Sequence, residues 1–282
     1  MQGEKTSKTA RIFIYVLLIF FSLLAIFPVV ILVSRSFFST SEITSIGAGL
    51  FPKEFTLSSY TDAFKDPVFL NGVRNTLIVC ISATVGVSLT AFMTAYAFTK
   101  IKFFGRKFWF TLGLCTMMIP SILLLLPVYK IFVDIGWYDT LLPLVVPNFF
   151  GGGIMNVFLI MQFLRGLPRE MHEAAEIDGA GTLRQMFQIS LPNVKPVIAY
   201  VGVTAFIAAW NDNMRPLLYI QSEENYTINR FIFEKYLVTQ DVFASAPNEQ
   251  MAIGVALMIP MVIIFILFQK QLIDGIQFTG SK

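Results

Sequence analysis

Long apolar runs without a charged residue constrain this chain more than any other feature. The run from Ile12 to Val33 is uncharged over 22 residues, and an α-helix needs about 20 residues to cross the hydrocarbon core of a bilayer. Such runs recur, so that 55% of the residues are hydrophobic and 14% are charged, against about 25% charged residues in soluble domains. The sequence therefore predicts an all-α, polytopic membrane protein.

Six transmembrane helices in a single membrane domain, residues 1–282, account for this pattern. Their expected bounds are about 12–34, 75–99, 108–129, 141–165, 197–214 and 251–269. The first run is longer than the apolar core of a signal peptide and has no small-residue cleavage site, so we expect it to be retained. The second is rich in Ala, Ser, Thr and Gly and is expected inside the bundle. Prolines and glycines predict breaks in the third and fourth.

The distribution of lysine and arginine predicts the orientation of the chain. Six spans place both termini on one side of the membrane, and the segments on that side hold 13 of the 21 Lys and Arg residues. Positive residues concentrate in cytoplasmic loops. We therefore expect both termini to be cytoplasmic. The net charge of +3 is too small to suggest a nucleic-acid partner.

The polar segment 166–196 lies between the fourth and fifth apolar runs and has the pattern of two helices joined by a sharp bend. Pro168 suits the first turn of a helix, and Gly179 has the position of a C-terminal glycine. Thr182 can cap a second helix, which the prolines at 192 and 196 are expected to stop. Small residues at the bend allow close approach by a partner.

The spacing within this segment is specific. Its fixed positions are Glu173, Ala174, Ala175, Gly179, Ile189, Leu191 and Pro192. They resemble the EAA loop of ABC-importer permeases, and the length and span pattern of the whole chain are similar to the carbohydrate-uptake permeases, the family of the maltose permease. The resemblance implies that residues 168–192 form a coupling helix seated in a cleft of a separate ATPase, with Glu173 and Asp178 positioning the loop. The alternative is a solvated loop that only joins two spans.

The resemblance also implies the partners. It implies a second permease that is a different chain, two ATPase subunits, and an external solute-binding protein that delivers a sugar or oligosaccharide at the bacterial cell membrane. The chain has no Gly-x-x-x-x-Gly-Lys-Ser/Thr phosphate loop. We therefore expect no enzyme activity and no cofactor in this chain, with ATP and magnesium bound by the partner ATPase. His172 is the single histidine, which excludes a multi-histidine metal site.

Polar residues within the fourth and fifth runs predict a solute pathway, because polar groups inside spans usually face a pathway or a partner. The expected pathway residues are Asn148, Asn156, Trp210, Asn211 and Asp212. The asparagines would bind hydroxyl groups, and Trp210 could stack on a sugar ring. Alternatively, they bond neighbouring helices or shape the bent fourth span. Arg215 departs from the apolar residue that the family pattern leads us to expect.

A secondary transporter or channel is the main alternative function. Such a protein needs coupling acids or a pore-lining ring, and Asp212 is the only acid close to a span centre. A purely structural membrane partner is a second alternative. Within the importer class, a polyol, a glycerophosphodiester or a peptide are alternative cargoes. The segment 215–250 is implied to reach the external binding protein, or else forms an interfacial aromatic belt.

Overall fold

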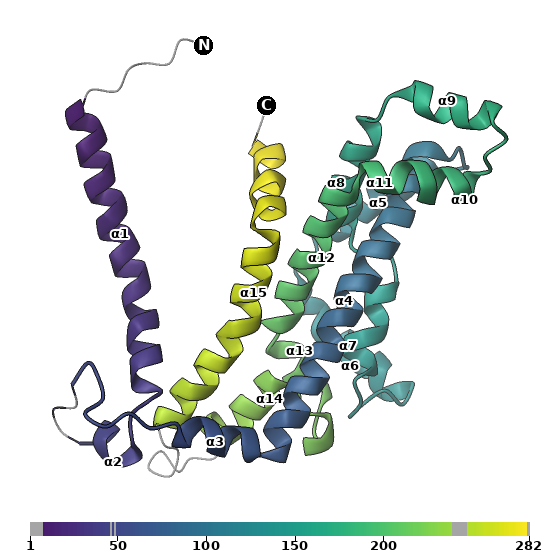
Figure 1. Cartoon of the computed structure of the whole chain (residues 1–282). Coiled ribbons are helices and arrows are strands. Elements are labelled where there is room, and N and C mark those ends of the chain that lie inside the picture. The colour runs from purple at the N-terminus through teal and green to yellow at the C-terminus, as the bar shows by residue number, and fades with distance from the viewer. Residues whose placement is uncertain (1–7, 46, 48, 239–246, 281–282) are drawn as a thin grey trace. The chain divides into compact units, whose positions relative to one another are not determined.

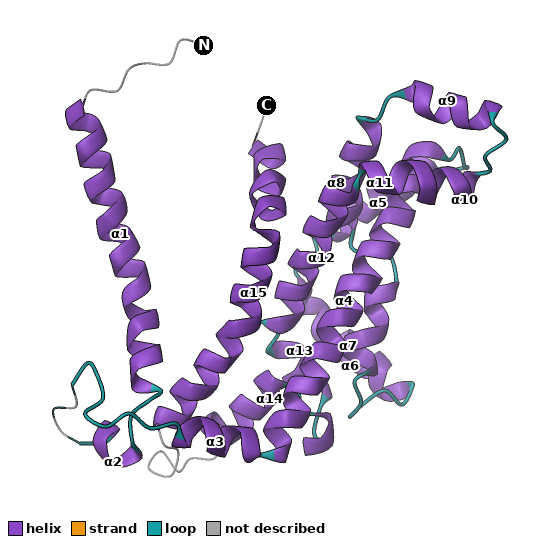
Figure 2. Ribbon diagram, viewed as in Figure 1, coloured by secondary structure: helices purple, strands orange, loops and turns teal. Residues whose placement is uncertain are grey.

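The structure is a computed structural model that describes residues 8–45, 47, 49–238 and 247–280, with side chains as far as Gln271. Every regular element in these ranges is a helix (Figure 2). Within the described residues, four helices are long and apolar enough to cross a membrane, and the number rises to six when each of two bent helix pairs is taken as one span. The prediction of an all-α, polytopic membrane protein is confirmed.

The contacts divide the chain into two compact units. The first comprises Met1–Asp66 with Lys235–Pro260, and the second comprises Pro67–Glu234 with Met261–Lys282. One helix, α15 (Pro247–Gly280), passes from the first unit to the second. The single domain expected from the sequence stays a prediction.

The first unit contains α1 (Lys8–Arg35), α2 (Thr40–Ile43), α3 (Ser58–Lys65), most of η4 (Glu234–Val238) and the beginning of α15. Asn248 joins these elements, because its buried amide donates hydrogen bonds to the Phe38 carbonyl at 3.1 Å and to the Ser59 hydroxyl at 2.8 Å. Lys235 binds Asp66 at 3.1 Å and Glu249 at 2.8 Å. The segment that ends before α4 is therefore fixed to the start of α15 by polar contacts.

The second unit is built around α4, which spans Pro67–Lys100. Its other elements are α5 (Arg106–Thr116), α6 (Ser121–Asp134), α7 (Leu142–Val145), η1 (Val146–Phe149), α8 (Ile154–Arg165), α9 (Arg169–Ile177), α10 (Thr182–Arg184), η2 (Gln185–Ser190), α11 (Leu191–Asn193), α12 (Lys195–Trp210), α13 (Met214–Tyr219), η3 (Glu223–Asn225) and α14 (Ile228–Phe233). Figure 1 shows α8 and α12 beside α4.

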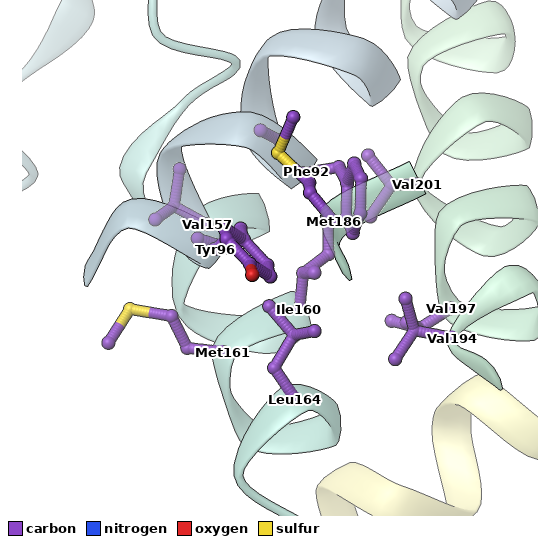
Figure 3. Packing of buried hydrophobic residues seen from close by; sticks show 12 residues of the cluster. Phe92, Tyr96, Val157, Ile160, Met161, Leu164, Met186, Val194, Val197 and Val201 are labelled. Carbon is purple, nitrogen blue, oxygen red and sulfur yellow. The ribbon is translucent and has the colours of Figure 1, made fainter. Parts of the chain in front are cut away.

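The core of this unit lies where α4, α8, η2 and α12 meet. Phe92 and Tyr96 of α4 pack there with Ile160 of α8 and Val201 of α12 (Figure 3). All four side chains are at most 2% exposed. Complete burial of a side chain of this size stabilises a fold by about 1.5–3 kcal/mol in water, but in lipid the gain comes from close packing.

Small residues let the backbones approach in this core. A methyl group on Gly202 of α12 would lie 2.9 Å from the Ser88 hydroxyl of α4. One on Gly86 of α4 would lie 2.8 Å from the Asn148 carbonyl oxygen of η1. Ala91 and Ala95 of α4 are fully buried. The expectation that the second span lies inside the bundle is therefore confirmed.

The observed helices differ from the expected spans mainly at their ends and breaks. α4 begins at Pro67, eight residues before the expected start, because a proline fits the first turn and the following residues pack on α14. The third span breaks at Pro120, and α5 and α6 meet at 101°. Pro127 lies inside α6 without ending it. The helix expected within residues 57–65 is α3.

Asp139, between α6 and α7, fastens two loops together. Its carboxylate accepts hydrogen bonds from the backbone N–H groups of Gln221 at 2.9 Å and Ser222 at 2.8 Å, and from the Ser222 hydroxyl. The Asn225 amide donates to the Asp139 carbonyl at 2.7 Å. Burial raises the pKa of Asp139, but the hydrogen bonds from Ser222 and Gln221 outweigh this effect, and the pKa lies below its ordinary value.

We predict that Asp139→Asn lowers the stability of the purified protein by about 1 kcal/mol at pH 7, allowing for solvent screening. Because the native pKa is lowered, the carboxylate contributes fully above its ordinary pKa of about 4, and the contribution is lost as the pH falls through the native pKa. Asp139→Ala lowers the stability further, by an amount that does not depend on pH. The backbone φ of residue 139 is 56°, and Ala tolerates this left-handed conformation less well than Asp or Asn. Thermal unfolding of both variants in detergent against pH measures these differences. Equal stability of wild type and Asp139→Asn at pH 7 would contradict the assignment.

Candidate functional site

The segment that carries the Glu173–Pro192 spacing begins with the short helix α9. Pro168 precedes its first residue, and Gly179 ends it with a φ of 74°. The N–H of Gly179 donates to the Glu176 carbonyl at 3.0 Å, and the N–H of Ala180 donates to the Ala175 carbonyl at 2.9 Å. This pair of bonds is the Schellman arrangement, which needs a left-handed residue after the helix. The predicted sharp bend at Gly179 is confirmed.

The second helical stretch differs from the expectation. Thr182 is the first residue of α10 rather than its cap, because Gly181 occupies the cap position without a side-chain bond. Pro192 lies inside the stretch, which continues to Asn193, and Pro196 lies in the first turn of α12. The middle of the stretch, η2, is a π-helix, a rare form that is frequent at functional sites. The stretch meets α12 at 81°.

A polar bridge holds the two stretches against each other. The buried Gln185 donates to the Ala180 carbonyl at 2.9 Å, and its amide oxygen lies 3.3 Å from His172 Nδ1. The Ser190 hydroxyl lies 3.5 Å from His172 Nε2. The single histidine therefore joins α9 to η2, a role that its place in the sequence did not indicate.

Large apolar side chains project from this segment. Ile177 is 87% exposed, and Leu183, on the other side of the bend, is 68% exposed. Of the predicted coupling residues, only Ala175 is buried; Ile189 and Leu191 are half-buried, and the exposed ones are Glu173, Ala174, Asp178, Gly179 and Pro192. Figure 1 shows α9 and α10 running across the end of the unit where α8 stops and α12 starts. Exposed apolar side chains on a polar segment between two spans are candidates for contact with a partner.

A cavity of about 450 Å³ opens among α4, η1, α8, α12 and α13. Its lining residues are Ala83, Val87, Pro147, Asn148, Phe150, Gly152, Gly153, Asn156, Thr204, Ala205, Ala208, Ala209 and Arg215. The break before α8 shapes it, because three consecutive glycines, 151–153, have φ values of 81°, 65° and 79°. The irregular fourth span expected from the sequence is confirmed, and its irregular part lines a cavity, where free backbone groups are tolerated.

Asn148 and Asn156 both line this cavity. The Asn148 amide donates to the Leu144 carbonyl at 2.8 Å and to the Ser82 hydroxyl at 3.3 Å. The Asn156 amide donates to the Gly152 carbonyl at 2.8 Å. Both residues therefore brace the broken helix with their N–H groups, and these bonds do not use the side-chain oxygens, which can still accept. The two alternatives considered for them, helix bonding and solute binding, are compatible.

The structure does not bring the other three expected pathway residues into the cavity lining. Trp210 is 6% exposed, and its ring stacks on Phe206 with centroids 6.0 Å apart. The exposed Asn211 donates to the Ile207 carbonyl at 2.9 Å. Asp212 pairs with Arg215. In this conformation, Trp210 offers no free ring face to a sugar because the fifth span ends by packing it inward.

Arg215 and Thr204 were missed as candidate pathway residues. Arg215 is the one charged group in the cavity lining, held by the Asp212 carboxylate through its Nε and its backbone N–H. The signal in the sequence was its charge just beyond an apolar run, at a position where the family pattern is apolar. Thr204 lies inside α12, and its hydroxyl donates to the Tyr200 or Val201 carbonyl at 3.0 Å. No feature of the sequence separates it from a packing threonine.

Comparison with known proteins gives a consistent result. Residues 86–277 match the family described as "Binding-protein-dependent transport system inner membrane component". The maltodextrin transport system permease protein MdxG of Bacillus subtilis (strain 168) is 30% identical, over 100% of both chains. The galactooligosaccharides transport system permease protein GanQ of the same organism is 29% identical, over 96% of this chain and 95% of that one.

A solved structure has the same fold. One chain of a bacterial ABC transporter involved in the import of the acidic polysaccharide alginate superposes with a TM-score of 0.84. The alignment covers 95% of this chain and 99% of that chain, at 23% sequence identity. At this identity the likeness establishes the fold alone.

We predict that Gly179→Ala lowers stability by about 1 kcal/mol, because a residue with a Cβ is strained at positive φ. Gly179→Asn costs less, since Asn tolerates this conformation. A steric clash, expected for a side chain at this corner, is not the cause, because no heavy atom lies within 4 Å of the Cβ position. The matched control is Gly181→Ala, at an equally open glycine with a φ of −67°. Thermal unfolding in detergent measures the series, and equal losses at both glycines would contradict the prediction.

Proposed function

The chain belongs to the family of binding-protein-dependent transport system inner membrane components, and we propose that it is the permease subunit of an ATP-driven importer of sugars or oligosaccharides. Members of this family are transport components, so the chain is a transport subunit and not an enzyme. The relatives named for maltodextrin and galactooligosaccharides support the choice of cargo. A secondary transporter or channel that works without an ATPase does not agree with membership of this family.

The exposed surface of the segment 168–192 is the observation that carries this proposal. Ile177 and Leu183 present apolar side chains on either side of the bend, next to the exposed Glu173 and Asp178. We propose that this surface docks into a separate ATPase, which binds ATP and magnesium. The Schellman bend and the Gln185–His172 bridge hold the segment together as one folded element. A displacement of its surface is therefore transmitted to the start of α12.

The remaining partners and the topology belong to the same proposal. The family description names dependence on a binding protein, so an external solute-binding protein delivers the cargo. A second, different permease completes the pathway. The distribution of lysine and arginine places both termini and the coupling segment on the cytoplasmic side of a bacterial cell membrane, together with the ATPase.

The polar cavity supports a solute pathway through this subunit. Free oxygens of Asn148 and Asn156 can accept hydrogen bonds from sugar hydroxyls, and Arg215 can donate to them. Small residues on α12, including Ala205 and Ala208, leave room on the opposite wall. Trp210, Asn211 and Asp212 stay predicted pathway residues, which a different conformation of the transporter would have to expose.

We predict that Ile177→Ser together with Leu183→Ser weakens ATPase association by about a hundredfold, since apolar residues at the centre of an interface often cost 2 kcal/mol or more. The chain itself stays folded because both side chains are exposed. The matched control is Ile135→Ser, at a side chain that is 52% exposed in the loop between α6 and α7. Co-purification and ATP hydrolysis of the assembled complex are the measurements. A double variant that retains the ATPase as wild type does would contradict the proposed docking surface.

We expect Gly179→Asp to abolish transport but not membrane insertion.

We predict that Asn156→Ala and Arg215→Gln each reduce transport by about tenfold, the usual effect of losing one hydrogen bond to a charged or polar partner. Neither change touches the coupling segment, so ATPase association stays normal. Asn211→Ala tests the adjoining exposed position in the same way. Uptake of labelled maltodextrin and galactooligosaccharide in cells that lack their own importers gives the readout. If uptake of every sugar tested is unchanged in the Asn156 and Arg215 variants, the cavity is not the pathway.

A further inference from the structure

The loop between α4 and α5 gathers positive charge without any acid to balance it. Lys100 ends α4, and Lys102, Arg106 and Lys107 follow within seven residues. The sequence has no Asp or Glu between Asp66 and Asp134. In the part of the chain that the structure describes, none of the ion pairs includes Lys102, Arg106 or Lys107. Among the described residues, the cluster therefore has no acidic partner.

The same loop forms a concave surface. A cleft of about 400 Å³ is lined by Lys102, Phe103, Gly105, Arg106, Lys107 and Phe108. Gly105 turns the chain with a φ of 75°, and the Trp109 N–H donates to the Gly105 carbonyl at 2.9 Å. Phe98 holds the loop at both ends, with ring centroids 5.5 Å from Phe103 and 5.6 Å from Phe110. The basic side chains thus surround a space that the backbone has shaped.

The positive charge in this region is not confined to the loop. Lys100 at the end of α4 and Arg169 of α9 add two further positive charges near the loop. Like charges that lie close together repel one another, and Lys102 and Lys107 are exposed while Arg106 is half-buried. A ligand with a negative group would relieve this repulsion. Its most direct contacts are the three basic side chains of the cleft.

Aromatic side chains beside the charges identify the kind of anion. Phe104 is 99% exposed, Phe108 is 63% exposed and Trp109 is 55% exposed. The loop follows α4, which is long and apolar enough to cross a membrane, and precedes α5 and α6, which pass the same test only as a bent pair. We therefore expect it at the level where a bilayer meets water. Aromatic rings favour this level, and basic pockets between transmembrane helices bind the phosphate groups of lipids. A free anion would use the charges but gain nothing from the exposed rings.

We propose that the cleft formed by residues 102–108 binds the phosphodiester headgroup of an anionic phospholipid. Lys102, Arg106 and Lys107 contact the phosphate, and the rings of Phe104 and Phe108 lie against the acyl chains. This site is distinct from the coupling segment and from the polar cavity. It requires only that the chain lies in a membrane, so it stands whether or not the proposed cargo is correct.

The experiment counts lipids on the purified full chain, together with any subunits that accompany it. The protein in mild detergent is incubated with equal amounts of phosphatidylglycerol and phosphatidylcholine, and the retained lipids are counted by native mass spectrometry. We expect a preference for phosphatidylglycerol, lowered about fivefold for each charge removed by Lys102→Gln, Arg106→Gln or Lys107→Gln. The matched control is Lys130→Gln, which removes one positive charge at an exposed lysine of α6.

A second variant guards against misfolding of the charge variants. Phe104→Ser removes a ring that is almost fully exposed, so the fold is unaffected, and we expect lower retention of phosphatidylglycerol. An unchanged lipid preference in the three charge variants would overturn the proposal. Displacement of phosphatidylglycerol by an equal concentration of inorganic phosphate would overturn it as well, because the site would then bind a soluble anion without using the rings.

Discussion

The close approach of α4 to its neighbours is the constraint on which the second unit depends. Lipid tails are as apolar as leucine, so helices in a bilayer associate through packing and interhelical hydrogen bonds instead of hydrophobic burial. Gly86 and Gly202 leave no room for a methyl group, and a Cβ on Gly152 would meet backbone atoms of Ala91. The core at Phe92 and Val201 exists only because these backbones touch.

The same close approach creates the polar cavity. Gly152 can sit against α4 because it has no Cβ and lies in the break at three glycines with positive φ that precedes α8. The side-chain amides of Asn148 and Asn156 donate to the backbone carbonyls of Leu144 and Gly152 on either side of the break. The close packing and the cavity therefore have one origin, because the glycine break that lets the chain before α8 approach α4 also borders the open space.

The sequence predicted features that depend on local chemistry. The apolar runs predicted the spans through their length and composition. Pro120 and the three glycines predicted the breaks, and Gly179 predicted the bend, because these residues act through their own backbone preferences. Features set by distant contacts were not predictable. The early start of α4 reflects packing on α14, the burial of Trp210 follows its stacking on Phe206, and the place of Arg215 in the cavity depends on a turn after α12. The π-helix at η2 has no marker in composition either.

The exposed side chains at the bend also bear on how such a subunit survives in the cell. In a chain without partners, Ile177 and Leu183 are exposed to water. Exposed apolar side chains of this kind promote aggregation. Chaperones and proteases act continuously on such surfaces. In the proposed complex the ATPase covers both side chains, so the lifetime of the subunit would depend on the supply of this partner, and unassembled chains would be degraded.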